Sequence, residues 1–274
     1  HRLMAALSQD VAPSPFYVAE LARYLQEATE AVPAMDGRAS IAATDDLLWR
    51  RVERLPAAAR RALECVTLSG GPIFRSAVRE AAALGGEELG ALHQLRLGHF
   101  IRVRHNDTTE LLEPYHDRIR QTVVRQLSAE QKRTQHLALA RSLEQSHSKD
   151  AEALARHFEL AEHHDSAGHY VRIAARQAAA ALAFERAAEL FRKALSWGDA
   201  TDAALLYAEL GEVLAASGRG RDAAESFLAA AERSKGESVQ KLRRRAGEQL
   251  VRSGYLDAGM TVLRENLALH GIHL

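Results

Sequence analysis

The 274-residue sequence has little of what disulfide-bonded, β-rich or membrane-spanning proteins contain. Its single cysteine, Cys65, excludes an intrachain disulfide and suits a small buried thiol in a reducing cytoplasm. Aromatic residues make up only 5% of the chain, which is lean for a β core. No apolar run approaches the roughly 20 residues of a membrane span, and no basic-then-apolar signal segment opens the sequence. We therefore expect a soluble protein of the cytoplasm.

The charges of the chain cancel, with 36 basic and 36 acidic residues. A protein without net charge has no global field to attract nucleic acid or an anionic membrane, so partners must be chosen by local surface. The composition is 47% hydrophobic and rich in alanine, leucine, arginine and glutamate, which favours helices. The length allows two domains.

The second half of the chain has the pattern of antiparallel helix pairs. One helix is indicated by Tyr207, Leu210, Gly211 and Leu214 on one face, and its partner by Ala223, Phe227 and Ala230. This combination resembles a tetratricopeptide repeat, in which a glycine lets the neighbouring helix approach closely. Such a unit must stack on others to bury its apolar face, so the resemblance implies an array that binds a partner.

A spacing of 36 residues supports the array. The residues Ala187, Phe191 and Ala194 recur 36 positions later as Ala223, Phe227 and Ala230. A weaker third copy is predicted at Ala258, Val262 and Glu265, and a degenerate earlier one at Ala155, Phe158 and Ala161.

The first half predicts helices followed by a small hairpin. Thr44 or Asp45 is expected to cap a first helix. Helices are then predicted over 57–68, 74–84 and 87–97, a β-hairpin around the polar turn 105–109, and helix over 115–145 with a break at Ser128. Helices with a hairpin behind them make a winged-helix shape. The expected fold class is thus all-α, mainly helical: a winged-helix module with a small β-hairpin, followed by a tetratricopeptide-like array.

Three segments, in this order, resemble signalling ATPases of the STAND class. They are Ser14–Leu25, which looks like the end of the nucleotide-binding module; Leu48–Pro56 with Ala59–Leu63, similar to the start of the winged helix; and Tyr115–Arg120, similar to the family's histidine motif. The resemblance implies a last helical part of an ATPase domain over 1–36, a winged helix over 37–146 and repeats over 147–274. The first residue, His1, also suggests a piece of a longer polypeptide.

The resemblance assigns roles to three residues. In that family the motif histidine donates a hydrogen bond to the β-phosphate of ADP, so His116 would be the nucleotide sensor. Asp117 would orient it, and Pro15 would lie against the adenine. The alternative is that His116 is an ordinary polar residue at a helix start.

Catalytic motifs are absent. No Gly-x-x-x-x-Gly-Lys-Ser/Thr loop occurs, so this chain is not expected to hydrolyse ATP or to hold a cofactor, and ADP or ATP would belong to the parent protein. No Ser-His-Asp, Cys-His or paired-carboxylate site can be argued from spacing. Four histidines could suggest a metal site, but their helical spacing favours exposed residues and no metal: His157, His163, His164 and His169.

The sequence accordingly predicts a regulatory, protein-interaction region in signal transduction, not an enzyme. Tyr207, Arg243 and Arg244 are candidate contacts for a protein partner or a small inducer on the array. The output domain of the parent could be a serine/threonine kinase, which we prefer by resemblance, a cyclase or a DNA-binding domain; oligomerisation stays open. The rival interpretation is a DNA-binding winged-helix regulator reading DNA through 87–97, although Glu87 and Glu88 open that helix with acidic charge. A third is a catalytic domain on a helical scaffold.

Overall fold

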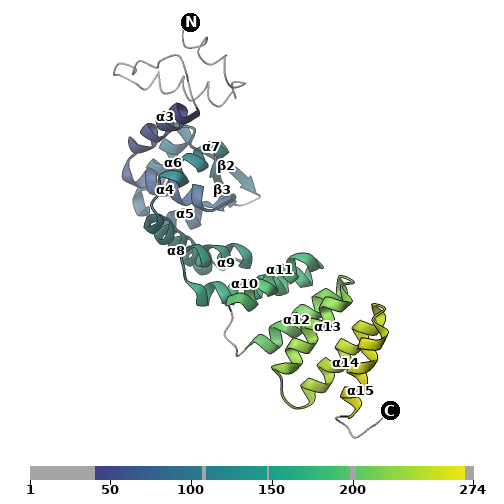
Figure 1. The fold of residues 1–274 in the computed structure, drawn as a ribbon. Helices are drawn as coiled ribbons and strands as arrows, with labels where there is room; N and C mark the ends of the chain where they lie inside the picture. The colour runs from purple at the N-terminus through teal and green to yellow at the C-terminus, as the bar shows by residue number, and fades with distance from the viewer. Residues whose placement is uncertain (1–40, 107–108, 147, 198–201, 269–274) are drawn as a thin grey trace. The chain divides into compact units, whose positions relative to one another are not determined.

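The computed structural model describes residues 41–106, 109–146, 148–197 and 202–268. The chain divides into two compact units, unit 1 ending at His147 and unit 2 beginning at Ser148. The described residues are mostly helical, which confirms the mainly helical fold class (Figure 1). The predicted ATPase segment 1–36, with Pro15, lies outside the described residues.

Unit 1 places a small sheet among helices. Its elements in order are α3 (Ile41–Glu53), α4 (Ala57–Leu68), β1 (Ile73–Phe74), α5 (Arg75–Ala81), the short 3-10 helix η1 (Gly85–Glu87), α6 (Glu88–Leu97), β2 (Ile101–Asn106), β3 (Thr109–Pro114), α7 (Asp117–Gln126) and α8 (Ala129–Gln145). The predicted helices and hairpin are confirmed, apart from shifts at their ends.

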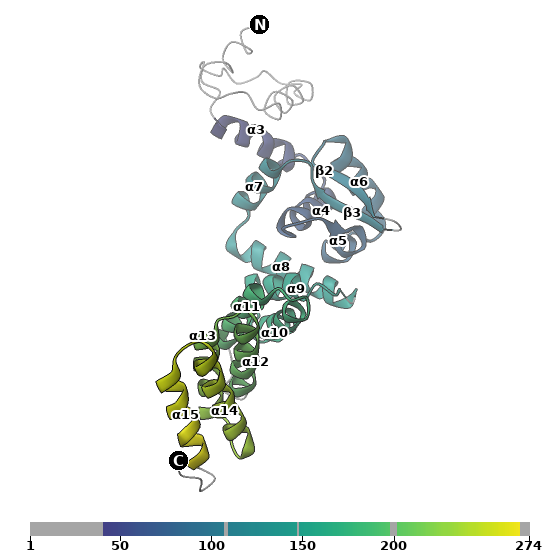
Figure 2. The same ribbon diagram turned by 90° about the vertical axis from the view of Figure 1, so that its right-hand side faces the viewer.

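The sheet has three antiparallel strands in the order β1-β3-β2. Leu112 of β3 pairs with Ile73 on one side and Val103 on the other, and its side chain is fully buried. Helices α4 and α5 pack on β3, and α6 packs on β2 (Figure 2). Strand β1 was not predicted, because it is only two residues long and shows no alternation.

The start of α3 corrects a second expectation. Thr44 and Asp45 do not cap a helix, because α3 already begins at Ile41. Asp45 instead lies on the same face of α3 as Leu48 and Val52, both buried. A charged residue thus stands on the face that packs into unit 1.

The predicted break at Ser128 separates α7 from α8 and is confirmed. Its hydroxyl accepts from the Gln131 N–H at 3.1 Å, while the Gln131 side chain accepts from the Ser128 N–H at 2.8 Å. This reciprocal capping box satisfies two backbone donors at the start of α8.

Unit 2 is built only of helices over its described residues. They are α9 (Ala151–Leu160), α10 (His164–Ala180), α11 (Phe184–Trp197), α12 (Ala203–Ala216), α13 (Gly220–Glu232), α14 (Glu237–Arg252) and α15 (Leu256–Ala268). Each helix packs against the next (Figure 1). Residues from α9 to α14 share one buried cluster. The helices therefore stabilise one another through a common interior.

The turns within unit 2 repeat with the predicted spacing of 36. Leu182, Gly218 and Gly254, each 36 residues apart, all have positive φ, of 60°, 78° and 85°. The same three backbone hydrogen bonds close each turn; at Gly218 they include Gly218 N–H to Ala215 O and the next N–H to Leu214 O. A left-handed residue just after a helix allows this closure, and glycine adopts it without strain.

The close approach predicted for Gly211 is also confirmed. A Cβ at Gly211 would lie 2.7 Å from the ring of Phe227 on α13. Thirty-six residues later, a Cβ at Gly247 would lie 2.6 Å from Leu263 of α15. Leu263 thus takes the place of Phe227 in the next copy of the repeat. With the same spacing of 36, Gly259 takes the place of Ala223 and Asn266 the place of Ala230.

The predicted third copy at Ala258, Val262 and Glu265 is consequently wrong by one position. Ala258 and Glu265 are exposed, whereas Gly259 and Asn266 are buried. Glycine at 259 and asparagine at 266 hid the true register, because a search for apolar residues passes over both.

Candidate functional sites

His116 caps the helix that follows the hairpin. Its backbone is extended, and its Nδ1 accepts a hydrogen bond from the Arg118 N–H at 3.1 Å. An accepting Nδ1 carries no proton, so the neutral ring holds its proton on Nε2. The side chain is exposed. His116 is thus fixed in a tautomer whose Nε2 is a hydrogen-bond donor.

Asp117 anchors the first turn of α7. Its Oδ1 accepts from Arg120 Nε at 2.8 Å and its Oδ2 from Gln121 Nε2 at 2.7 Å. The hydrogen bond from Arg120 is the main cause that lowers the pKa of this carboxyl below its usual value. An acidic residue in the first helical turn also interacts favourably with the helix dipole.

Asp45 joins α3 to the same turn of α7, although the sequence predicted it only as a possible helix cap. Its two oxygens accept from Arg118 Nε and Nη2, both at 2.6 Å, and from Arg125 Nη1 at 2.9 Å. Thr122 Oγ1 donates to it at 3.2 Å. The signal was its place on the apolar face of α3, where a buried carboxylate needs donors from another element.

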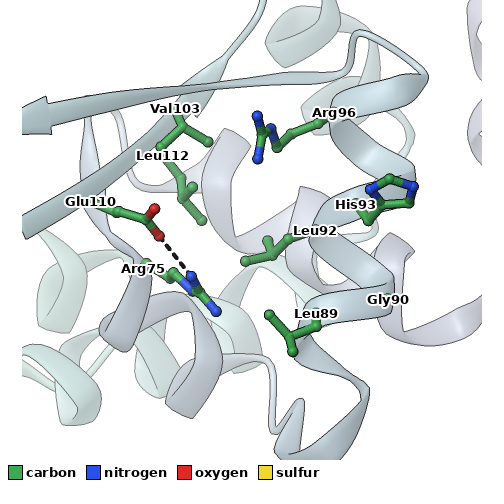
Figure 3. Close-up of a pocket in the computed structure, with 9 residues that line it drawn as sticks. All are labelled: Arg75, Leu89, Gly90, Leu92, His93, Arg96, Val103, Glu110 and Leu112. Carbon is green, nitrogen blue, oxygen red and sulfur yellow. Dashed lines mark hydrogen bonds and ion pairs between the residues drawn. The ribbon is translucent and has the colours of Figure 1, made fainter.

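A cavity of about 460 Å³ opens between α6 and the strands β2 and β3 (Figure 3). Its lining comes from the start of α5, one side of α6, and both strands: Arg75, Leu89, Gly90, Leu92, His93, Arg96, Val103, Glu110 and Leu112. Sequence spacing could not reveal it, because the lining residues meet only when the hairpin packs on α6.

Most charges around this cavity are paired. Arg75 donates to Glu110 at 2.7 Å (Figure 3). It also donates to Glu88 at 2.5 Å. Those hydrogen bonds, the one to Glu110 first, raise the pKa of Arg75, and the Arg75 bond is also the main cause that lowers the pKa of Glu110. Arg96, by contrast, makes no ion pair with any residue in the described ranges.

The acidic residues at the start of α6 are paired with arginines, so they are less able to repel a DNA backbone than the sequence suggested. The Glu88 side chain is only 13% exposed and is occupied by Arg75, while Glu87 lies 3.7 Å from Arg61. On the outer face of α6, Leu89 is 71% exposed and Leu97 is 67% exposed. The exposed surface of α6 also carries the polar side chains of His93, Gln94 and Arg96.

The three partner-binding candidates on the array make contacts within unit 2. The guanidinium of Arg233 lies 4.8 Å from the ring centroid of Tyr207. Arg243 lies 3.7 Å from Glu265, and Arg244 lies 2.5 Å from Glu248. These are exposed or half-buried surface contacts, which are weak and can be exchanged for contacts to a partner.

Ion pairs connect successive helix pairs at nearly the repeat spacing. Three of them join residues 34 positions apart, and two join residues 33 apart: Glu152–Arg186, Glu159–Lys193, Glu185–Arg219, Arg176–Glu209 and Glu212–Arg245. Because exposed ion pairs contribute little to the free energy of unfolding, these pairs mainly favour one alignment of each helix pair on the next.

The histidines of unit 2 need one correction. His163, His164 and His169 are exposed as expected, but His157 is 1% exposed and belongs to the interior of α9. No group of metal-ligating side chains occurs in the described parts of the chain.

Cys65 is buried, as predicted, and its thiol faces Gln135 Oε1 at 3.3 Å. Burial, reinforced by the neighbouring Glu64 charge, raises its pKa to about 12. A thiol with that pKa is not a nucleophile near neutral pH.

Comparisons with known proteins assign no family. No family model matches the chain, and no curated protein gives a significant match. Among the described helices, none combines the length and apolar character required to cross a bilayer.

Proposed function

We propose that this chain is the regulatory and protein-interaction region of a STAND-class signalling ATPase. In this proposal unit 1 is a winged-helix module, and unit 2 is a tetratricopeptide-like array that couples partner binding to a nucleotide switch elsewhere in the parent protein. The order α4-β1-α5-α6-β2-β3 and the 36-residue period of the turns support the two assignments.

The observation that carries the proposal is the geometry of His116. It stands at the start of the helix after the hairpin, where the resembled family has its sensor histidine, and its Nδ1 accepts from the backbone, so that Nε2 carries the ring proton. A phosphate oxygen is a strong acceptor for such a donor. Loss of that hydrogen bond on nucleotide exchange would release unit 1 from the ATPase domain, which is a two-state switch.

Asp117 and Asp45 support this role indirectly. Asp117 holds the first turn of α7 through Arg120 and Gln121, and Asp45 fixes Arg118 from α3. Because the sensor is thereby mounted on rigid elements, its displacement would move α3 and α7 together. Pro15 keeps its proposed place against the adenine by resemblance only.

The array supplies the input in this proposal. A stack of helix pairs presents a continuous surface on which a protein or a small inducer can bind, and Tyr207, Arg243 and Arg244 are our candidate contacts. No catalytic chemistry, metal or cofactor is proposed for this chain.

The test separates the proposed nucleotide-sensing role of His116 from its role as a helix cap. Aspartate is a good N-cap, so His116→Asp retains an acceptor for the Arg118 N–H but removes the ring donor and adds negative charge beside the phosphate. In the full-length protein we expect His116→Asp and His116→Ala both to accelerate release of a fluorescent ADP analogue at least about tenfold, a loss of about 1.4 kcal/mol. His169→Ala, an exposed histidine of unit 2, is the matched control. Unchanged release from His116→Asp would leave His116 as a helix cap only.

A DNA-binding winged-helix regulator is the second candidate, supported by the exposed His93 and Arg96 on α6. A filter-binding assay with random duplex DNA tests it. Affinity that falls steeply with salt would favour DNA binding. The proposed regulatory function predicts no binding even at low salt.

A further inference from the structure

The cavity beside α6 combines an apolar interior with one uncommitted positive charge. Leu89, Leu92, Val103 and Leu112 form the apolar part of the lining. A volume of about 460 Å³ lies within the range of small-molecule sites, roughly 300–1,000 Å³. The shape and lining suit a compact organic molecule.

The ionic groups of the lining decide the charge of such a molecule. Arg75 is paired with both Glu88 and Glu110, so these three groups sum to one negative charge and contribute no free positive charge. Arg96 remains, and Figure 3 shows its side chain extending from α6 across the cavity towards Val103. His93 lies on the same helix and adds a second donor. One anionic group can therefore be held beside Arg96.

The carboxylate of Glu110 limits the choice further. It lies in the wall of the cavity, where it repels a multiply charged phosphate or a nucleic-acid backbone. A single carboxylate placed at Arg96, on the α6 side, pairs with a planar guanidinium by two parallel hydrogen bonds. The rest of the ligand then covers Leu89, which is otherwise 71% exposed.

We infer that this cavity is a binding site for a small organic monocarboxylate with a compact apolar body. Arg96 and His93 hold the carboxylate, and the leucines and Val103 contact the apolar body. The lining includes neither His116 nor any residue of unit 2, so the inference does not depend on the function proposed above.

Gly90 provides a way to block the cavity without disturbing the fold. It lines the cavity within α6, and a Cβ built there meets no heavy atom within 4 Å. Leucine in place of a helical glycine also favours the helix. Gly168 of α10 is a matched control, because a Cβ there likewise meets nothing within 4 Å.

The experiment measures binding of three probes to the 274-residue chain by NMR chemical-shift titration. The probes are hexanoate, 4-phenylbutyrate and indole-3-acetate. We expect at least one to bind with a Kd below about 1 mM and to shift amides of α6 and β2. The neutral amide of that probe should bind at least about fivefold more weakly.

Two variants locate the site. Arg96→Gln should weaken the acid at least about fivefold while leaving the neutral amide unchanged, whereas Arg192→Gln, an exposed arginine of α11, should have no effect. Gly90→Leu should abolish binding of both forms, with Gly168→Leu as its control and circular dichroism as the check on folding. The inference is overturned if none of the three acids binds, if acid and amide bind equally, or if Gly90→Leu binds like the original chain.

Discussion

The close packing of α12 on α13 makes a quantitative prediction for Gly211→Ala. The new methyl group would lie 2.7 Å from the edge of the Phe227 ring, far inside van der Waals contact. The ring is fully buried, and the guanidinium of Arg245 lies 4.7 Å from its centroid, so the ring has no room to retreat. Overpacking of this kind costs about 1–3 kcal/mol.

Helix propensity acts in the opposite direction. Replacing a helical glycine by alanine stabilises by about 0.5–1 kcal/mol. The net expectation for Gly211→Ala is a loss of about 1–2 kcal/mol in the free energy of unfolding of unit 2. Gly168→Ala, with no atom near its Cβ, should instead gain about 0.5–1 kcal/mol.

The assay is urea unfolding followed by tryptophan fluorescence. The chain has two tryptophans, so a Trp49→Phe background leaves Trp197 of α11 as the reporter of unit 2. Combining Gly211→Ala with Phe227→Leu should cost less than the sum of the single changes, because the smaller side chain makes room. Equal stabilisation by Gly211→Ala and Gly168→Ala would refute the close approach of the two helices.

Three further predictions concern turns, the buried ion pair and the thiol. Leu182→Gly should raise the unfolding free energy by about 0.5–1 kcal/mol, because leucine is strained at φ 60°. Ala181→Gly, at the neighbouring position, should lower the unfolding free energy by a similar amount. Both are measured by thermal unfolding, and destabilisation by Leu182→Gly would contradict the repeated turn. Asp45→Asn should lower the free energy of unfolding by about 2–4 kcal/mol, because it removes the carboxylate that pairs with Arg118. Asp46→Asn, at an exposed position, should lower it by less than about 0.5 kcal/mol. Similar losses for the two variants in urea unfolding would argue against the α3–α7 link. Cys65 is buried and its pKa is raised to about 12, so in the native chain at neutral pH it should not react with a thiol-reactive disulfide reagent. In urea it should react fully. Rapid reaction of the native chain would show that the thiol is not buried.

The helices could be predicted because their signals are local. Apolar spacing fixed α4 and the α12–α13 pair, and Ser128 marked a helix boundary through its own hydroxyl. The strand β1 could not be predicted, because two residues carry no period and pair with β3 only through the tertiary fold.

The errors in the sites have a similar origin. The shifted third repeat shows that a close approach selects for a small residue, Gly259, rather than an apolar one. His157 was expected at the surface because polarity alone does not report which helix covers a side chain. Asp45 and the cavity beside α6 depend on residues distant in sequence, although Asp45 was detectable as a charge on an apolar helix face.

Regulation of a nucleotide switch by the array is the central claim, and nucleotide release tests it most directly. The measurement compares dissociation of a fluorescent ADP analogue from the full-length parent protein and from the same protein lacking only residues 148–274. The account predicts that removing unit 2 changes the release rate several-fold, and that His116→Asp accelerates release in both forms. Identical release with and without unit 2, or the absence of any nucleotide-binding domain in the parent, would contradict it.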